Sequence, residues 1–163
     1  MNITFAPNGM LQIDDARIIF RNFRGEASKY NREGDRNFSV VIDDEELAYA
    51  LRDDVNKYGV GWNVKIRPPR EDGDIPFMHL PVKVKFNTKG PAVRLTTGNR
   101  TVKLTEDTIE MLDEIDIRSV SLDIRPYDNE VNGKPFRSAY LHSIHVTQEV
   151  DRFAALDDEE DVF

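Results

Sequence analysis

The sequence contains no cysteine, and this absence excludes several kinds of chemistry. Without thiols the chain can form no disulfide, no thiolate metal site and no cysteine nucleophile, which agrees with a reducing compartment. No segment approaches the roughly 20 consecutive apolar residues that a membrane-spanning helix needs. Residues 1–10 lack both the basic segment and the apolar run of a signal peptide, so nothing marks the protein for export. We therefore expect a cytoplasmic protein without a membrane role.

Catalytic and metal-binding motifs are also scarce. The chain has neither a glycine-rich phosphate loop nor a Gly-x-Ser-x-Gly motif. His142 and His145 would face opposite sides of a predicted strand, and His79 falls in a predicted loop, so we interpret all three as structural. Acid pairs such as Asp14 with Asp15 are typical of caps and turns and would bind Mg²⁺ only if folding brought several together. We expect no enzymatic activity, no cofactor and no metal, with a metal-dependent nuclease or nucleotide-processing enzyme as the alternative.

The net charge of −8 is unevenly distributed along the 163 residues. Residues 149–163 carry seven acids and one base, so the rest of the chain nets only −2. Residues 62–103 hold nine bases and three acids, whereas residues 43–58 hold six acids and two bases. Basic and acidic surfaces should therefore be separate, and the total charge is a misleading guide to nucleic-acid binding.

Apolar residues alternate with polar ones at period two along much of the chain, which predicts β-strands. The stretch 10–23 is interpreted as one long strand, with a bulge or bend where the phase changes near Asp14 and Asp15 and with Phe20 on its core face. Residues 24–35 are interpreted as a loop. The other predicted strands cover 38–42, 62–66, 82–86, 120–124 and 139–147, with hairpin turns at Gly98-Asn99 and Asn132-Gly133.

Helical spacing appears twice. Asp43 or Asp44 can cap a helix that carries Leu47, Ala50, Leu51, Val55 and Tyr58 and ends near Gly59, and Thr105 can cap a shorter one with Ile109, Leu112 and Ile115. The pattern predicts a mainly β fold: an OB-type, partly closed five-stranded barrel with additional strands or hairpins and one or two short helices. Residues 1–148 would form this domain. Patterning alone does not exclude a sandwich.

Positive charge and exposed aromatic rings are the two ingredients that hold single-stranded nucleic acid, each stacked base contributing roughly 1 to 3 kcal/mol. Phe38, Trp62 and Phe86 share a face with aliphatic residues and are assigned to the core. The better stacking candidates lie in loops or at strand ends: Phe23, Tyr30, Phe77, Tyr127 and Phe136. The predicted DNA-binding residues are Arg21, Arg24, Lys29, Tyr30, Arg32, Arg36, Lys65, Arg67, Arg70, Lys83, Lys85, Arg94, Arg100 and Tyr127. The alternative for any single lysine is that it only keeps an exposed strand soluble.

The C-terminal end combines acids with a terminal ring. Its residues are Asp157, Asp158, Glu159, Glu160, Asp161, Val162 and Phe163. A run of acids cannot offset its ordering entropy by burial, so residues 149–163 are predicted to be a disordered acidic tail with its last two residues exposed. A partner with an apolar pocket ringed by Lys or Arg would bind the ring and the acids together. The same tail could instead occupy the protein's own basic groove, or serve only as a solubilising end.

Several of these features together resemble phage-encoded single-stranded-DNA-binding proteins of OB fold. They are the strand through Phe23, the Lys29-Tyr30 loop, residues 38–42, Gly61-Trp62, and residues 124–146 with the Asn132-Gly133 turn. The tail is similar to those of bacterial and phage single-stranded-DNA-binding proteins, which often end in acids and a Phe, except that Val162 stands where the bacterial form has Pro. The resemblance implies a protein that coats single-stranded DNA in the host cytoplasm during phage replication or recombination. It would act without sequence preference or catalysis and recruit replication or recombination proteins through its tail.

One alternative of a different class stays open: a protein-interaction or virion structural module that does not bind DNA. Salt-sensitive DNA affinity separates the two, because phosphate neutralisation makes binding weaken steeply with salt. The sequence does not establish the oligomeric state, and a homo-oligomer is one option. It also leaves open the footprint, the preference for DNA over RNA and the partner of the tail.

Overall fold

The computed structural model describes residues 1–151, whose strands form one ten-stranded sheet that does not close into a complete barrel. The main path runs through β1 (Asn2–Phe5), β2 (Leu11–Asp14), β9 (Ile117–Val131), β10 (Lys134–Gln148), β6 (Phe77–Val84), β4 (Arg36–Ile42) and β3 (Ile18–Asn22). Off this path, β5 (Lys65–Arg67) pairs with β6, and β7 (Ala92–Thr97) pairs with β10 and with β8 (Arg100–Leu104). The predicted mainly β fold is confirmed, and the open sheet is consistent with an OB-type barrel.

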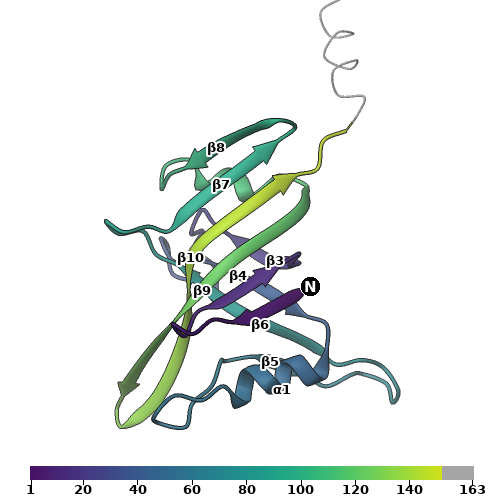
Figure 1. Ribbon diagram of the computed structural model, residues 1–163, viewed down its shortest axis with the longest axis vertical. Helices are drawn as coiled ribbons and strands as arrows, with labels where there is room; N and C mark the ends of the chain where they lie inside the picture. The colour runs from purple at the N-terminus through teal and green to yellow at the C-terminus, as the bar shows by residue number, and fades with distance from the viewer. Residues whose placement is uncertain (152–163) are drawn as a thin grey trace, which may run out of the picture.

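The long hairpin of β9 and β10 lies in the middle of the sheet (Figure 1). Its turn is the predicted Asn132-Gly133 pair, and both residues have positive φ, as a tight two-residue hairpin turn requires. The first part of β10 lies parallel to β6, with Tyr140 opposite Lys83. After a bulge between Leu141 and Ser143, β10 lies parallel to β7 instead. One long strand therefore joins two parts of the sheet: β6 with its neighbours, and the hairpin of β7 and β8.

The stretch 10–23 is not one bent strand, which corrects the sequence interpretation. Asp15 has φ 52°, and β2 and β3 on either side of it pair with different strands, β1 and β9 for β2 and β4 for β3. A second irregularity lies between Ile19 and Asn22, where the pairing with β4 shifts and Phe20 also has φ 52°. The shift turns Phe20 outward, with 61% of its surface exposed, and Phe23 inward, fully buried. Both aromatic residues were assigned to the wrong side.

Helix α1 (Glu45–Asp53) begins where the acids predict it, because the Asp44 side chain accepts a hydrogen bond from the Glu46 amide. It ends at Asp53 and not near Gly59, and it buries Ala48 and Leu51. The second predicted helix is a 3₁₀ turn, η1 (Ile109–Asp113). Among residues 1–151, no helix is long and apolar enough to cross a membrane.

Trp62 lies in the core, as the sequence predicts, with 2% of its surface exposed. Its indole Nε1 donates to Asp54 Oδ2 at 2.9 Å, and the Arg137 guanidinium lies 5.0 Å from the ring centre. The preceding Gly61 is required by the approach of the chain to α1, because a Cβ there would stand 2.0 Å from the Arg52 carbonyl oxygen. Trp62 is therefore not available as a stacking surface.

Candidate nucleic-acid interface

The sheet presents a polar and aromatic outer face across β5, β6, β4, β10 and β9. Alternate residues of β6, such as Met78, Leu80 and Val82, are buried in the core, so the residues between them point outward. Register then places the outward residues of neighbouring strands beside them. We call this surface the outer face; it comprises Asn37, Ser39, Val41, Lys65, Arg67, Phe77, His79, Pro81, Lys83, Arg125 and Tyr140.

Three rings meet where β3 approaches β6. The Phe20 ring centre lies 6.2 Å from that of Phe77 and 5.5 Å from that of His79, and the latter two are 5.2 Å apart. Phe20 approaches both rings edge-on, which is a favourable geometry for aromatic pairs. We call these three residues the aromatic cluster. Its largest exposed ring, Phe20, is held in place by two neighbours instead of moving freely over the surface.

Two cations of β5 border the aromatic cluster. Lys65 is paired opposite His79, and the Arg67 guanidinium lies 5.6 Å from the Phe77 ring centre. The pKa of His79 lies below its ordinary value, chiefly because burial disfavours the charged ring and further because of the charges of Lys65 and Arg67. Its Nδ1 is within hydrogen-bond distance, 3.0 Å, of the Ser39 hydroxyl. The aromatic cluster and these two cations thus place ring surfaces and positive charge side by side.

A second aromatic group lies on β9 and β10. The Tyr140 ring is met edge-on by Tyr127, with 5.6 Å between the ring centres. Lys83 Nζ lies 6.0 Å and the Arg125 guanidinium 5.1 Å from the centre of the same ring. We call Tyr127 and Tyr140 the tyrosine pair. Because β10 runs beside β6, it lies on the same outer face as the aromatic cluster.

Two hollows lie in the surface near the tyrosine pair and the end of β6. A groove beside the tyrosine pair is lined by residues that include Tyr30, Asn37, Pro81, Lys83 and Tyr140. A second hollow, beyond the end of β6, is lined by Lys85, Asn87, Thr88, Lys89, Gly90, Pro91, Arg125, Leu141 and His142, with no acid among them. The two share Lys85 in their linings, so they adjoin and form one path, although the first also contains the acids Asp35 and Glu106.

Six of the sequence-predicted residues are brought together along this path. They are Tyr30, Lys65, Arg67, Lys83, Lys85 and Tyr127. Tyr30 is 89% exposed at the tip of the 24–35 loop, where the Asn31 amide group donates to the carbonyls of Glu26, Arg32 and Asp35. The loop is thus tied internally while its ring stands in solvent. Lys29, Arg32 and Arg70 are exposed on neighbouring loops.

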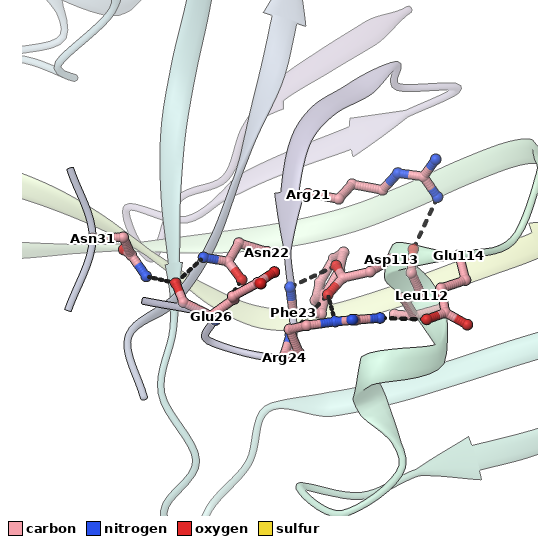
Figure 2. A network of polar contacts seen from close by, with 9 residues as sticks. All are labelled: Arg21, Asn22, Phe23, Arg24, Glu26, Asn31, Leu112, Asp113 and Glu114. Atoms are coloured by element: carbon pink, nitrogen blue, oxygen red, sulfur yellow. Dashed lines mark hydrogen bonds and ion pairs between the residues drawn. The ribbon is translucent and has the colours of Figure 1, made fainter. Parts of the chain in front are cut away.

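Three predicted arginines are engaged within the protein. Arg21 Nη1 donates to the backbone carbonyls of Leu112 and Ile115, and Arg24 pairs with Asp113 and Glu114 (Figure 2). The pKa of Arg24 is raised, mainly by its hydrogen bond to Glu114. These contacts attach β3 to η1.

Arg36 similarly lies 3.5 Å from Glu106 and 5.6 Å from the Phe86 ring centre. DNA contacts of these three arginines stay a prediction. Each guanidinium already has a structural partner.

Arg94 and Arg100 lie apart from the other predicted residues. They belong to the hairpin of β7 and β8, which stands at the opposite end of the long axis from α1 and β5 (Figure 1). Arg94 is exposed and paired with His145 of β10. A single strand would have to follow β10 upward to reach them.

Sequence reasoning missed four residues of the outer face and the aromatic cluster: Phe20, His79, Tyr140 and Arg125. Phe20 and His79 were misplaced, since Phe20 was assigned to the core and His79 to a loop, whereas His79 lies within β6. Tyr140 follows Ala139 at the start of a predicted strand, and alternation with buried Ala139 and Leu141 was the signal for its outward side. Among residues 1–151, no group of three His, Cys, Asp or Glu side chains is placed to hold a metal ion.

Comparison with known proteins supports this description. The single-stranded DNA-binding protein of bacteriophage Enc34, in a C-terminally truncated form, superposes with a TM-score of 0.53 at 16% identity, covering 92% of this chain and 91% of that one. The same phage protein in complex with ssDNA gives a TM-score of 0.52 at 16% identity over 94% of each chain. At this identity the likeness shows the fold. No curated protein sequence matches the chain. A family model described as a putative phage ssDNA-binding domain matches residues 2–158, and the chain belongs to that family.

Proposed function

We propose that this protein binds single-stranded DNA on its outer face without sequence preference. The observation that carries the proposal is the aromatic cluster, in which an exposed Phe20 ring is braced by Phe77 and His79 and bordered by Lys65 and Arg67. Every base has a face that can stack on such a ring, and phosphates carry no sequence information, so this combination binds single strands generally.

The path of the strand follows from the distribution of rings and cations. It runs from the aromatic cluster across Pro81 and Lys83 to the tyrosine pair and on toward Lys85 and Arg125. Membership in the family supports this function, and so does the complex of the Enc34 protein with ssDNA. The role we infer is non-catalytic: the protein would cover single strands in the host cytoplasm during phage replication or recombination.

We further propose that the C-terminal tail recruits replication or recombination proteins. Its residues, from Asp157 to Phe163, lie outside the described residues, so this proposal rests on their chemistry alone. A basic, apolar-lined pocket on a partner would accept the ring of Phe163 together with the acids. If the tail also competes for the outer face, its removal will tighten DNA binding.

Fluorescence anisotropy with labelled oligo-dT tests the proposal. The full-length chain and a version ending at Leu156 would be measured at low and moderate salt, with duplex DNA as competitor. We expect single strands to win over duplex, affinity to fall with salt, and truncation to tighten binding. Lys57→Gln removes a lysine charge away from the outer face, beside α1, where Nζ lies over the Tyr58 ring. It is the control for the loss of one positive charge and should bind like wild type. If neither version binds at low salt, the interaction-module alternative replaces this function.

A further inference from the structure

His79 is an unusual component of a stacking surface, because its charge can change near neutral pH. It lies within β6 and is surrounded on three sides: Phe20 of β3, Ser39 of β4 and Lys65 of β5. Phe77 completes the contacts along its own strand. The charged groups facing it are Lys65 and Arg67, and none of the residues that contact or pair with it is acidic.

This arrangement favours the neutral ring in the free protein. Partial burial and the two cations all act against a third positive charge, in agreement with the lowered pKa of His79. A DNA phosphate placed against Lys65 and Arg67 would reverse that balance, since a negative charge close to the ring favours the imidazolium. Binding and protonation would then support each other.

The hydrogen bonds of the ring allow both charge states. Nδ1 faces the Ser39 hydroxyl at 3.0 Å, and a hydroxyl can either donate to a neutral ring nitrogen or accept from a protonated one. Ser39 is itself buried, with 5% of its surface exposed, so this contact is shielded from solvent. In the part of the chain that the structure describes, Nε2 has no hydrogen-bond partner. Nε2 is therefore the atom that can donate to a phosphate or to a base.

We propose that His79 is a proton-linked contact of the interface: it becomes an imidazolium when single-stranded DNA binds and donates through Nε2. This inference rests on the proposed function. Because the bound state takes up a proton, affinity must rise as the pH falls between the pKa values of the bound and free forms. Each unit by which DNA raises the pKa of His79 corresponds to a tenfold gain in affinity at low pH.

The test compares oligo-dT affinity of the full-length protein between pH 8 and pH 5.5 at constant low salt. Wild type should tighten by about threefold or more as the pH falls across this range. His79→Gln keeps polarity but cannot be charged, so it should still bind and lose most of this dependence. His145→Gln is the matched control: its Nε2 lies 2.7 Å from Thr96 Oγ1, away from the aromatic cluster, and it should retain the wild-type dependence.

Calorimetry of the wild-type protein gives a second measurement that needs no variant. At pH 6.5 the observed binding enthalpy should depend on the ionisation enthalpy of the buffer, with a sign that reports proton uptake. Wild-type affinity that rises with acidity equally in His79→Gln, or calorimetry without proton uptake, would overturn the inference and leave the DNA-binding function intact. Absence of DNA binding by the wild type at every pH would instead overturn the function itself.

Discussion

Phe20 and Phe23 lie three residues apart around the end of β3 and should respond to truncation in opposite ways. Phe20 is 61% exposed and belongs to the aromatic cluster. Phe23 is fully buried and stacks on Phe38 with 5.1 Å between ring centres. Phe20→Ala should therefore weaken DNA binding and Phe23→Ala should weaken the fold.

The expected magnitudes follow from what each ring contacts. Losing one base–aromatic stack costs roughly 1 to 3 kcal/mol of binding, which corresponds to about 5-fold to 150-fold in affinity. Since Phe20 buries about two-fifths of its surface, its removal should cost only about 1 kcal/mol of unfolding free energy. Phe23→Ala removes a fully buried ring and should cost about 3 to 5 kcal/mol, a large part of a typical total of about 5 to 15 kcal/mol.

Anisotropy with oligo-dT at fixed salt measures the loss of binding, and urea unfolding followed by circular dichroism measures the loss of stability. Phe23→Ala, where it remains folded, should keep near wild-type affinity, and this makes each variant the control for the other. A folded Phe20→Ala protein with unchanged affinity would refute the stacking role of the aromatic cluster. A loss of several kcal/mol of stability in Phe20→Ala would refute the assignment of its ring to the surface.

Three further predictions concern charge, backbone approach and acid stability. Lys83→Gln should lower the slope of log affinity against log salt by about 0.7, the value for one phosphate contact on a single strand, and an unchanged slope would remove Lys83 from the path. Gly61→Ala should lower the free energy of unfolding in urea by about 3 kcal/mol, because its Cβ would stand 2.0 Å from the Arg52 carbonyl oxygen. A loss below about 0.5 kcal/mol would show that the chain relaxes freely there. The pKa of Asp128 is lowered, chiefly by its hydrogen bond with Arg137, so its stabilising contribution is complete above the ordinary value of 3.8 and is lost as the pH falls below it. An NMR titration of Arg137→Gln should show this pKa rising toward 3.8, and an unshifted value would contradict the assigned cause.

Much of the fold could be predicted because local signals agreed with the final structure. The Asn132-Gly133 and Gly98-Asn99 turns, the Asp44 cap and the core position of Trp62 all follow from short-range patterns. Such signals depend on residues only a few positions apart. They locate elements well but do not specify which strands pair.

Phe20 and Phe23 show where this reasoning reaches its limit. Strict alternation from Ile18 places Phe20 inward, but the register of β3 shifts between Ile19 and Asn22 and the backbone adopts a positive φ at Phe20. A single irregularity of this kind exchanges the inner and outer sides of everything after it. No period-two pattern contains that information, so the sequence pattern places both aromatic residues on the wrong side.

In the candidate site too, some residues could be predicted from local sequence and others depend on long-range strand pairing. Lys65, Arg67 and Lys83 could be predicted, since they alternate with apolar residues within one basic stretch of sequence. Tyr140 and Arg125 could not be placed beside them, because their proximity depends on β10 lying parallel to β6. Parallel neighbours are distant in sequence and leave no short-range signal.

The pairing of β6 with β10 also explains why the two aromatic groups can act as one surface. Tyr140 of β10 is paired with Lys83 of β6, and Lys83 Nζ lies over the Tyr140 ring. The same lysine lines the groove beside the tyrosine pair. Lys83 thus lies where β6, β10 and the expected phosphate path meet. Its charge can stabilise a bound strand there only while β6 and β10 stay paired. The proposed single-strand interface is therefore a product of sheet topology, and it would be lost if β10 paired elsewhere even with every basic and aromatic residue retained.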